Sequence, residues 1–236
     1  MFLDADEVIN KGLINSGVHR VQIYKLALLS LFPNQLMKSI GEKTTVPLLH
    51  YMLLNLIPLR LVYLTRNPAL ATANGQFMLF DAAIYRQNQW HEMVKDEIVE
   101  DDQIMKKIKQ ANYKSELLLA NGMISCRMYK NYPNAISGFS KNALAVFNNS
   151  IPALLAYILL LIGGPMIVLM TLNFSLIFFM GGLILLTRIM ISLSAGQNAW
   201  INIIFHPIQM VNIVIIGFLS IQKNLTQTNT WKGRRV

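Results

Sequence analysis

The sequence predicts an α/β domain followed by a C-terminal region of transmembrane helices, and two observations support this. All 12 acidic residues lie between Asp4 and Glu116, whereas the segment 151–221 contains a single formal charge, Arg188. The first 150 residues alternate short strand-like runs with helical ones, as α/β proteins do. We therefore expect a compact domain at 1–150, membrane helices at 151–222 and a basic tail at 223–236.

The short apolar run Phe2-Leu3 predicts the end of a strand at the start of the domain. Four later strands are expected at 26–31, 77–80, 116–119 and 124–129, and a helix at 99–110. Residues 45–64 are apolar but contain Pro47 and Pro58. We interpret this segment as an interfacial helix that presses the domain onto the bilayer, and a short buried core helix is the alternative.

Segments 151–172 and 174–193 each approach the roughly 20 apolar residues that cross a bilayer. A third segment, 201–221, contains His206, Pro207, Gln209 and Asn212, so a re-entrant or protein-packed helix suits it as well as a simple span does. We expect a multi-pass protein of the cell membrane with two or three spans.

Charge predicts the orientation of these spans. The domain is polar, lacks a basic secretory leader, and carries Arg127, Lys130 and Lys141 ahead of the first span, so it should be cytoplasmic. The basic tail at 232–235 should be cytoplasmic as well. Three complete spans would put these basic regions on opposite sides. Either one hydrophobic segment therefore does not cross, or the tail is an exception.

The net charge of +9 is carried by scattered residues and by residues beside the membrane segments. Attraction to anionic lipid explains this distribution, and no nucleic-acid motif accompanies it. The single cysteine, Cys126, excludes an internal disulfide and a CxxC metal site, so we expect a reduced, packed thiol.

Asp4 and Asp6 follow the first strand at positions i and i+2. In an extended segment both side chains would point to the same side, where carboxylate oxygens suit Mg²⁺ or Mn²⁺ shared with substrate phosphates. The pair is therefore a candidate metal site. An ordinary surface turn is the alternative.

A run of acidic residues at 96–102 precedes the helix expected at 99–110. Asp101 has helical spacing to Ile104, Met105 and Ile108 and so shares the apolar face, where a carboxylate is costly unless it is used, for example as a general base. Asp102 lies four residues before Lys106 and is expected to form a surface ion pair. The alternative for the whole run is a solvated helix N-terminus.

Asn74, Gly75 and Gln76 directly precede the strand expected at 77–80. The glycine permits close approach of the backbone to a ligand, and uncharged amides can bond sugar hydroxyls. A simple turn is the alternative.

Six motifs occur in an order that resembles a known family. They are FLDADE at 2–7, ANGQFMLF at 73–80, IVEDDQIMKKIK at 98–109, CRMY at 126–129, GFSKN at 138–142 and WKGRR at 231–235. Together they resemble the inverting family 2 glycosyltransferases, in particular the membrane-bound branch that glycosylates carotenoid- and hopanoid-type lipids. The resemblance extends over almost the whole chain.

The resemblance implies a GT-A fold and assigns a role to each motif. Asp4 and Asp6 would hold Mg²⁺ or Mn²⁺ and the nucleotide-sugar donor. Asp101 would be the base that deprotonates a lipid acceptor, and Glu100 would support it. Asn74, Gly75 and Gln76 would line the acceptor or sugar pocket. His91 follows Gln89-Trp90 where the family commonly has two glycines, so we interpret it as a structural histidine.

Two departures from the family limit what the resemblance implies. Processive polysaccharide synthases usually carry Gln-x-x-Arg-Trp where this chain has 138–142, so polymer extrusion is disfavoured. Family members also have a nucleotide-binding half before Asp-x-Asp that this sequence lacks. Because buried parallel strands do not tolerate missing neighbours, we expect impaired nucleotide binding and folding. The alternative function is a non-catalytic membrane protein, either a remnant or a partner subunit.

Overall fold

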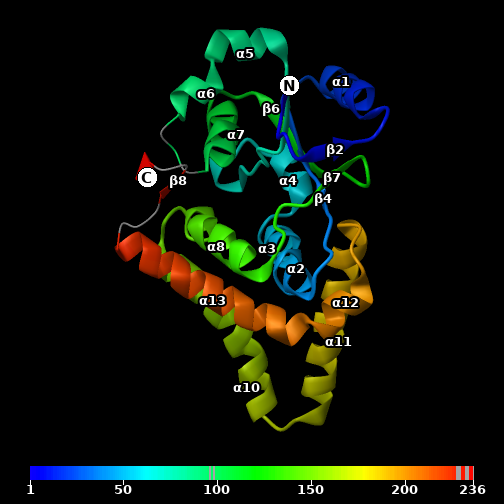
Figure 1. Cartoon of the computed structure of the whole chain (residues 1–236), viewed down its shortest axis with the longest axis vertical. Coiled ribbons are helices and arrows are strands. Elements are labelled where there is room, and N and C mark those ends of the chain that lie inside the picture. The colour runs from blue at the N-terminus through cyan, green and yellow to red at the C-terminus, as the bar shows by residue number, and fades with distance from the viewer. Residues whose placement is uncertain (96, 98, 227–229, 232–233, 236) are drawn as a thin grey trace. The chain divides into compact units, whose positions relative to one another are not determined.

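A computed structural model of the protein describes residues 1–95, 97, 99–226, 230–231 and 234–235. The chain forms two compact units, and Figure 1 traces its course by colour from the N-terminus to the C-terminus. The first unit contains Met1–Leu36 and Met52–Met128, and the second contains Met37–Tyr51 and Tyr129–Val236. Asp96 and Ile98 of the acidic run and Lys232 and Gly233 of the tail lie outside the described residues.

The first unit is built on a four-stranded sheet with the order β1-β5-β3-β6. Its strands are β1 (Phe2–Leu3), β5 (Phe77–Phe80), β3 (Leu26–Phe32) and β6 (Lys114–Leu119). Strand β3 is parallel to β6 and antiparallel to β5, and all seven of its residues are buried. A strand covered on both faces reads as a continuous apolar run, which is why these strands could be predicted from the sequence. The predicted strands at 26–31, 77–80 and 116–119 are confirmed.

A second sheet of three short strands has the order β2-β7-β4. It contains β2 (Glu7–Ile9), β7 (Ile124–Cys126) and β4 (Asn34–Gln35). Strands β2 and β7 are antiparallel, and Glu7 lies directly opposite Cys126. The strand predicted at 124–129 is wrong beyond Cys126, because β7 ends there.

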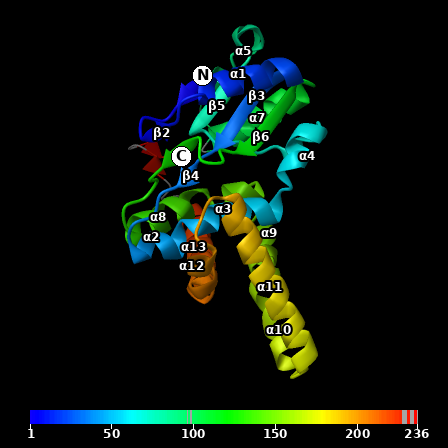
Figure 2. The same ribbon diagram turned by 90° about the vertical axis from the view of Figure 1, so that its right-hand side faces the viewer.

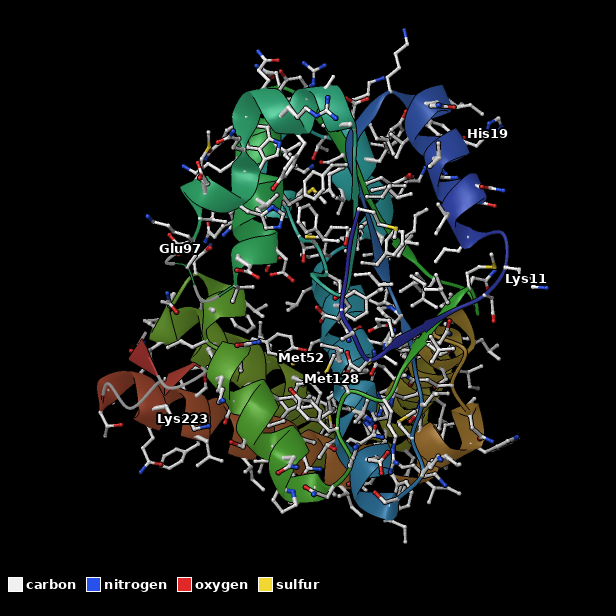
Figure 3. The ribbon with its side chains drawn as sticks, turned by 45° about the horizontal axis from the view of Figure 1, so that its top comes forward. Lys11, His19, Met52, Glu97, Met128 and Lys223 are labelled. Atoms are coloured by element: carbon white, nitrogen blue, oxygen red, sulfur yellow. The ribbon has the colours of Figure 1, made fainter. Side chains whose placement is uncertain are left out.

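Helices of the first unit cover its sheet. They are α1 (Leu13–Tyr24), α4 (Leu59–Leu64), η1 (Pro68–Leu70), α5 (Ala82–Asn88), α6 (Trp90–Met93) and α7 (Glu100–Gln110). The side chains of Lys11 and His19, before and within α1, extend away from the unit (Figure 3). Helix α1 packs against β3 and β5 closely enough that a Cβ at Gly17 would lie 3.1 Å from the Leu79 side chain.

Helix α7 confirms the predicted helix at 99–110. Its apolar face, formed by Ile104, Met105 and Ile108, is fully buried. Lys109 is buried on the same helix, and its ammonium donates to the carbonyl oxygens of Val62 and Thr65 at 2.6 Å each. These two bonds stabilise the buried charge and fix the end of α4 against α7.

The second unit is helical apart from one short strand pair. It contains α2 (Ile40–Thr45), the start of α3 (Pro47–Leu56), α8 (Tyr132–Asn142), η2 (Ala145–Phe147), α9 (Ile151–Ile158), η3 (Leu159–Gly163), α10 (Gly164–Met170), α11 (Phe174–Ser194), α12 (Ala199–Ile204), α13 (His206–Leu225), β8 (Thr230–Trp231) and β9 (Arg234–Arg235). The segment at 45–64, interpreted as one interfacial helix, is divided among α2, α3 and α4. Pro58 separates α3 from α4 because proline disfavours helical backbone in the residue before it.

Three helical stretches are long and apolar enough to cross a bilayer: Ile151–Met170, Phe174–Ser194 and His206–Leu225. The predicted hydrophobic segments are therefore helical, although the third begins at His206 because 199–204 forms the separate helix α12. The first two form a hairpin that projects from the rest of their unit (Figure 2). The hairpin exposes large apolar side chains that include Leu160, Met170, Phe174 and Phe178.

Helix α13 buries polar side chains and turns an apolar face outward. The Gln209 amide donates to the carbonyl of Lys43 at 2.9 Å, and the Asn212 amide donates to that of Thr44 at 2.9 Å. The Ser220 hydroxyl accepts from the Leu144 amide at 3.0 Å. Helix α13 packs chiefly against α8, α2 and α9, and it runs across the base of the hairpin rather than along it (Figures 1 and 2). Its outward residues include Ile208, Val211 and Phe218.

Arg188, the only formal charge in 151–221, is 2% exposed in α11. Its guanidinium carbon lies 4.4 Å from the centre of the Tyr51 ring. A cation–π contact of this kind contributes about 0.5–2 kcal/mol. Withdrawing an ion from water costs several kcal/mol. The contact with Tyr51 therefore offsets only part of the cost of burying Arg188.

Candidate functional site

The segment Asn74–Gln76 lies between two groups of acidic side chains in the first unit. It is anchored to β3 by Ser30, whose hydroxyl accepts from the Asn74 amide at 2.8 Å and donates to the Asn74 carbonyl at 3.0 Å. The side chains of Asn74 and Gln76 are buried and bond to each other at 3.3 Å. This segment therefore holds a fixed shape at the entrance to β5.

Asp101 is at the first turn of α7 and contacts the middle of that segment. The Gly75 amide donates to Oδ2 of Asp101 at 2.8 Å, and the Asp102 amide donates to Oδ1 at 2.9 Å. Burial raises the pKa of Asp101 to about 7, with a smaller contribution from the charge of Asp102, while the two backbone donors oppose the rise. A carboxyl group with this pKa changes its protonation near neutral pH, as a general base does.

Asp102 does not lie on the surface, so the prediction of a surface ion pair is wrong in that respect. Its side chain is half-buried, and Oδ1 accepts from the Thr72 hydroxyl and from the Ala73 amide at 2.9 Å each. Burial raises the pKa of Asp102, against the effect of these donors and of the Lys106 charge. Asp101 and Asp102 together hold the loop 72–75, because they accept hydrogen bonds from the Gly75 and Ala73 amides of that loop.

Glu100, predicted to support Asp101, is the exposed first residue of α7. Its charge acts on His91. Nδ1 of His91 lies 2.9 Å from the Tyr85 hydroxyl, and the His91 ring packs against Phe2 at 4.3 Å between centroids. These contacts agree with a structural role for His91. Support of Asp101 by Glu100 stays a prediction.

Asp4 precedes a turn and Asp6 lies within it, so the two residues do not share one extended strand. Strand β1 ends at Leu3, residues 5 and 6 form the turn, and the Glu7 amide donates to the Asp4 carbonyl at 3.3 Å. The Asp4 amide also donates to the Gln76 carbonyl at 3.1 Å. This bond continues the pairing of β1 with β5 and places the backbone of Asp4 beside the segment Asn74–Gln76.

A second acidic group forms around Asp6. Ligand atoms of Asp6, Glu7 and Cys126 all lie within 4.8 Å of one another. The Cys126 thiol accepts from the Gln76 side-chain amide at 3.1 Å and donates to the Asp6 carboxylate at 3.7 Å. Burial raises the pKa of Glu7 to about 7, with smaller contributions from the charges of Asp6 and Asp4, and Cys126 opposes the rise. The expected packing of the thiol is confirmed, because Cys126 is buried.

The residues around Asp6 fit a hard divalent cation. Asp6 and Glu7 supply carboxylate oxygens, which Mg²⁺ and Mn²⁺ prefer, and the exposed side of Asp6 leaves room for water or phosphate ligands. Burial raises the pKa of the Cys126 thiol, so it stays protonated and is a poor ligand for these ions. A cation here would relieve the repulsion between the carboxylates.

The structure thus brings the backbone of Asp4 and the carboxylate of Asp101 to one short segment, Asn74–Gln76, and links Asp6 to that segment through Cys126. Sequence reasoning missed Glu7, Cys126 and Thr72. Glu7 directly follows the predicted pair, but only the pairing of β2 with β7 places it opposite Cys126. Thr72 carries no signal in the sequence beyond its nearness to Asn74.

Comparison with known proteins gives no further identification. No protein-family model, no curated protein and no solved structure matches this chain.

Proposed function

We propose that this protein is an inverting glycosyltransferase that moves a sugar from a nucleotide-sugar donor to a carotenoid- or hopanoid-type lipid in the membrane. The observation that carries the proposal is the Asp101 carboxylate, which accepts from the Gly75 amide at 2.8 Å in the segment that also contains Asn74 and Gln76. A base held beside amides that can bond sugar hydroxyls is what a single displacement at an anomeric carbon requires.

In this reaction Asp101 takes the proton from a lipid hydroxyl or carboxyl group. The acceptor oxygen forms a bond to the anomeric carbon as the bond from that carbon to the nucleoside diphosphate breaks, which inverts the configuration. Glu100 supports Asp101, and Asn74, Gly75 and Gln76 position the sugar or the acceptor. Mg²⁺ or Mn²⁺ held by Asp4 and Asp6, with Glu7, would supply positive charge for the diphosphate.

Three long apolar helices support an acceptor that is itself in the bilayer. We further propose that only the hairpin of Ile151–Met170 and Phe174–Ser194 crosses the membrane, and that α13 lies at the interface. The buried polar side of α13 and its apolar outward face suit a helix lying along the membrane surface. Lys141 and the basic tail then share the cytoplasmic side, as the charge rule requires.

A second function has one observation in its favour. Asp101 and Asp102 both accept hydrogen bonds from the loop 72–75, so the acidic pair already has a structural use. A non-catalytic membrane protein, either a remnant or a partner subunit, would need no more than this.

Transfer of radiolabelled sugar by membranes that contain the chain separates the two functions. General-base catalysis contributes about 10²–10⁴-fold, so Asp101→Asn should lower transfer by that factor. Asp81→Asn is a matched control, because Asp81 caps α5 through the amides of Ala83 and Ile84, and asparagine caps as well as aspartate. Background transfer by the unmodified chain, equal to that of Asp101→Asn, would support the non-catalytic function.

A further inference from the structure

A buried cation in the second unit lacks a counter-ion. The Nε and Nη2 atoms of Arg188 are buried and have no hydrogen-bond partner among the described residues. A guanidinium stays protonated in proteins and presents its donors in a rigid fork. Arg188 therefore holds a full positive charge with at least two unused donors.

Three further polar side chains of this unit lie near Arg188 or near the ring that it contacts. Tyr51 of α3 lies under it, and His206 of α13 and Tyr157 of α9 lie within electrostatic range of Arg188 and Tyr51 respectively. Nδ1 of His206 and the hydroxyl oxygen of Tyr157 are also buried without a partner among the described residues. Tyr51 thus relates side chains of four helices in one unit: it contacts Arg188 of α11 and the His206 ring of α13, at 6.2 Å between centroids, and interacts electrostatically with Tyr157 of α9.

No acidic side chain of this unit can neutralise Arg188. Within 37–51 and 129–236 the only acidic residue is Glu42. Its carboxylate accepts from the amides of Lys38 and Ser39 and from the Ser39 hydroxyl, forming the capping box of α2. The anion that balances Arg188 must therefore come from outside this unit.

Other buried polar side chains of this unit do have hydrogen-bond partners. The Asn202 amide donates to the Ser192 hydroxyl and to the Gln197 carbonyl oxygen at 2.9 Å each. The Gln197 amide in turn lies 3.2 Å from Nδ1 of His50. These groups are bonded to one another, whereas Nε and Nη2 of Arg188 have no partner among the described residues.

The position of Arg188 along its helix points to the membrane interface. It lies six residues before the end of α11 at Ser194, roughly 9 Å at 1.5 Å per residue. Tyr157 and His206 are half-buried, although the Tyr157 hydroxyl oxygen and Nδ1 of His206 are themselves buried. Headgroup oxygens of a lipid can reach this depth when a cation draws them in.

We propose that Arg188, Tyr51, Tyr157 and His206 bind the anionic group of a membrane lipid, a phosphate or a carboxylate. Both anions match the fork of a guanidinium and can accept from a tyrosine hydroxyl as well. This site does not depend on sugar transfer, since it lies in the other unit from Asp101 and needs no donor.

The test uses the full chain purified in a neutral detergent, with binding followed by native mass spectrometry and by thermal unfolding. Phosphatidylglycerol, oleate, phosphatidylcholine and inorganic phosphate are added separately. We expect phosphatidylglycerol, oleate or both to bind and to raise the unfolding temperature. Binding of phosphatidylglycerol alone identifies a phosphate site, and binding of oleate alone identifies a carboxylate site. A response to inorganic phosphate without a response to either lipid would overturn the lipid assignment.

Variants at Arg188 distinguish binding at this site from general electrostatic attraction between anionic lipid and the basic chain. Arg188→Gln should weaken binding of the anionic lipid about tenfold or more, because charge-assisted hydrogen bonds are lost. Arg188→Leu should unfold no earlier than the unmodified chain in neutral detergent, since it removes an unbalanced buried charge. Lys130→Gln, which removes an exposed basic residue, is the matched control and should bind normally. Equal binding by Arg188→Gln and by Lys130→Gln would overturn the proposal.

Discussion

The backbone amide of Gly75 donates a 2.8 Å hydrogen bond to Oδ2 of Asp101, across 26 positions of sequence. The bond joins the loop before β5 to the first turn of α7. It also fixes a carboxyl group whose pKa is about 7 at the backbone between Asn74 and Gln76. Orientation and protonation of the candidate base thus depend on the same contact.

The pH dependence of sugar transfer should report Asp101. Burial raises the pKa of this carboxyl group to about 7, so the base is protonated and inactive below that value. We expect transfer to rise with pH through about 7 and to level off above it. Initial rates of radiolabelled transfer between pH 5 and 9 measure this. A rate that is flat over the whole range would argue against Asp101 as the base.

Stability should change with pH in the opposite direction. The folded-state pKa of Asp101 lies above its unfolded value of 3.8, so the folded chain binds more protons than the unfolded chain between about pH 4 and 7. The contribution of Asp101 to stability is therefore lost as pH rises through that window. Relative to Asp101→Asn, the unmodified chain should be most stable near pH 4 and should lose this advantage by pH 8. Thermal unfolding of both at several pH values checks this, and an advantage that grows with pH would contradict it.

Gly75→Ala should separate ligand approach from folding. A Cβ at Gly75 would lie 3.5 Å from Oδ2 of Asp101, an ordinary contact, and Gly75 is not among the residues with positive φ. The change should alter stability by no more than about 1 kcal/mol. If the sugar or acceptor packs against this backbone, transfer should nevertheless fall. Normal unfolding with normal transfer would show that nothing approaches Gly75 closely.

Metal binding can be measured without enzyme activity. Electron paramagnetic resonance of Mn²⁺ should show that Asp6→Asn and Glu7→Gln each weaken binding, because both carboxylates belong to the group within 4.8 Å. Cys126→Ser should change binding little, since a protonated thiol is a poor ligand for Mn²⁺. Asp81→Asn again serves as the control. A larger loss of Mn²⁺ binding in Cys126→Ser than in Glu7→Gln would contradict this set of ligands.

Lys109 offers a test of the first unit's core. Lys109→Met keeps the length of the side chain but leaves the carbonyls of Val62 and Thr65 without their donor. At about 1.5–3 kcal/mol for each of two charged hydrogen bonds, we expect a loss of about 3–6 kcal/mol in the free energy of unfolding. Lys107→Met, on the exposed face of the same helix, should lie within about 0.5 kcal/mol of the unmodified chain. Similar losses in both variants would contradict a special role for Lys109.

The sequence predicted the buried strands and α7 well because each carries a strong periodic signal. The continuous apolar run of β3 and the spacing of Ile104, Met105 and Ile108 in α7 are local patterns. Asp101 could also be placed inward by that spacing. Asp102 could not, because its position is decided by Thr72 and Ala73, about 30 residues away.

The group around Asp6 also depends on contacts that local sequence patterns do not predict. Asp6 has a recognisable partner in Asp4, but Glu7 meets Cys126 only through the register of β2 with β7. Neighbours in sequence predicted Asp4 as the second ligand, whereas Glu7 and Cys126 are the residues found within reach of Asp6. Register between short strands has no signature in either strand alone.

The hydrogen bond from Gln209 to the Lys43 carbonyl has a consequence for synthesis of the chain. Its two residues are 166 positions apart, and ribosomes add about 5–20 residues per second. Residues 37–51 therefore wait roughly 8–33 s before α13 exists to cover them. During that time the carbonyls of Lys43 and Thr44 lack the donors that α13 supplies, and we expect the membrane surface or a chaperone to shield them. Depletion of membrane-insertion factors should consequently impair folding of the second unit. The affected residues, 37–51, are synthesised long before its first span.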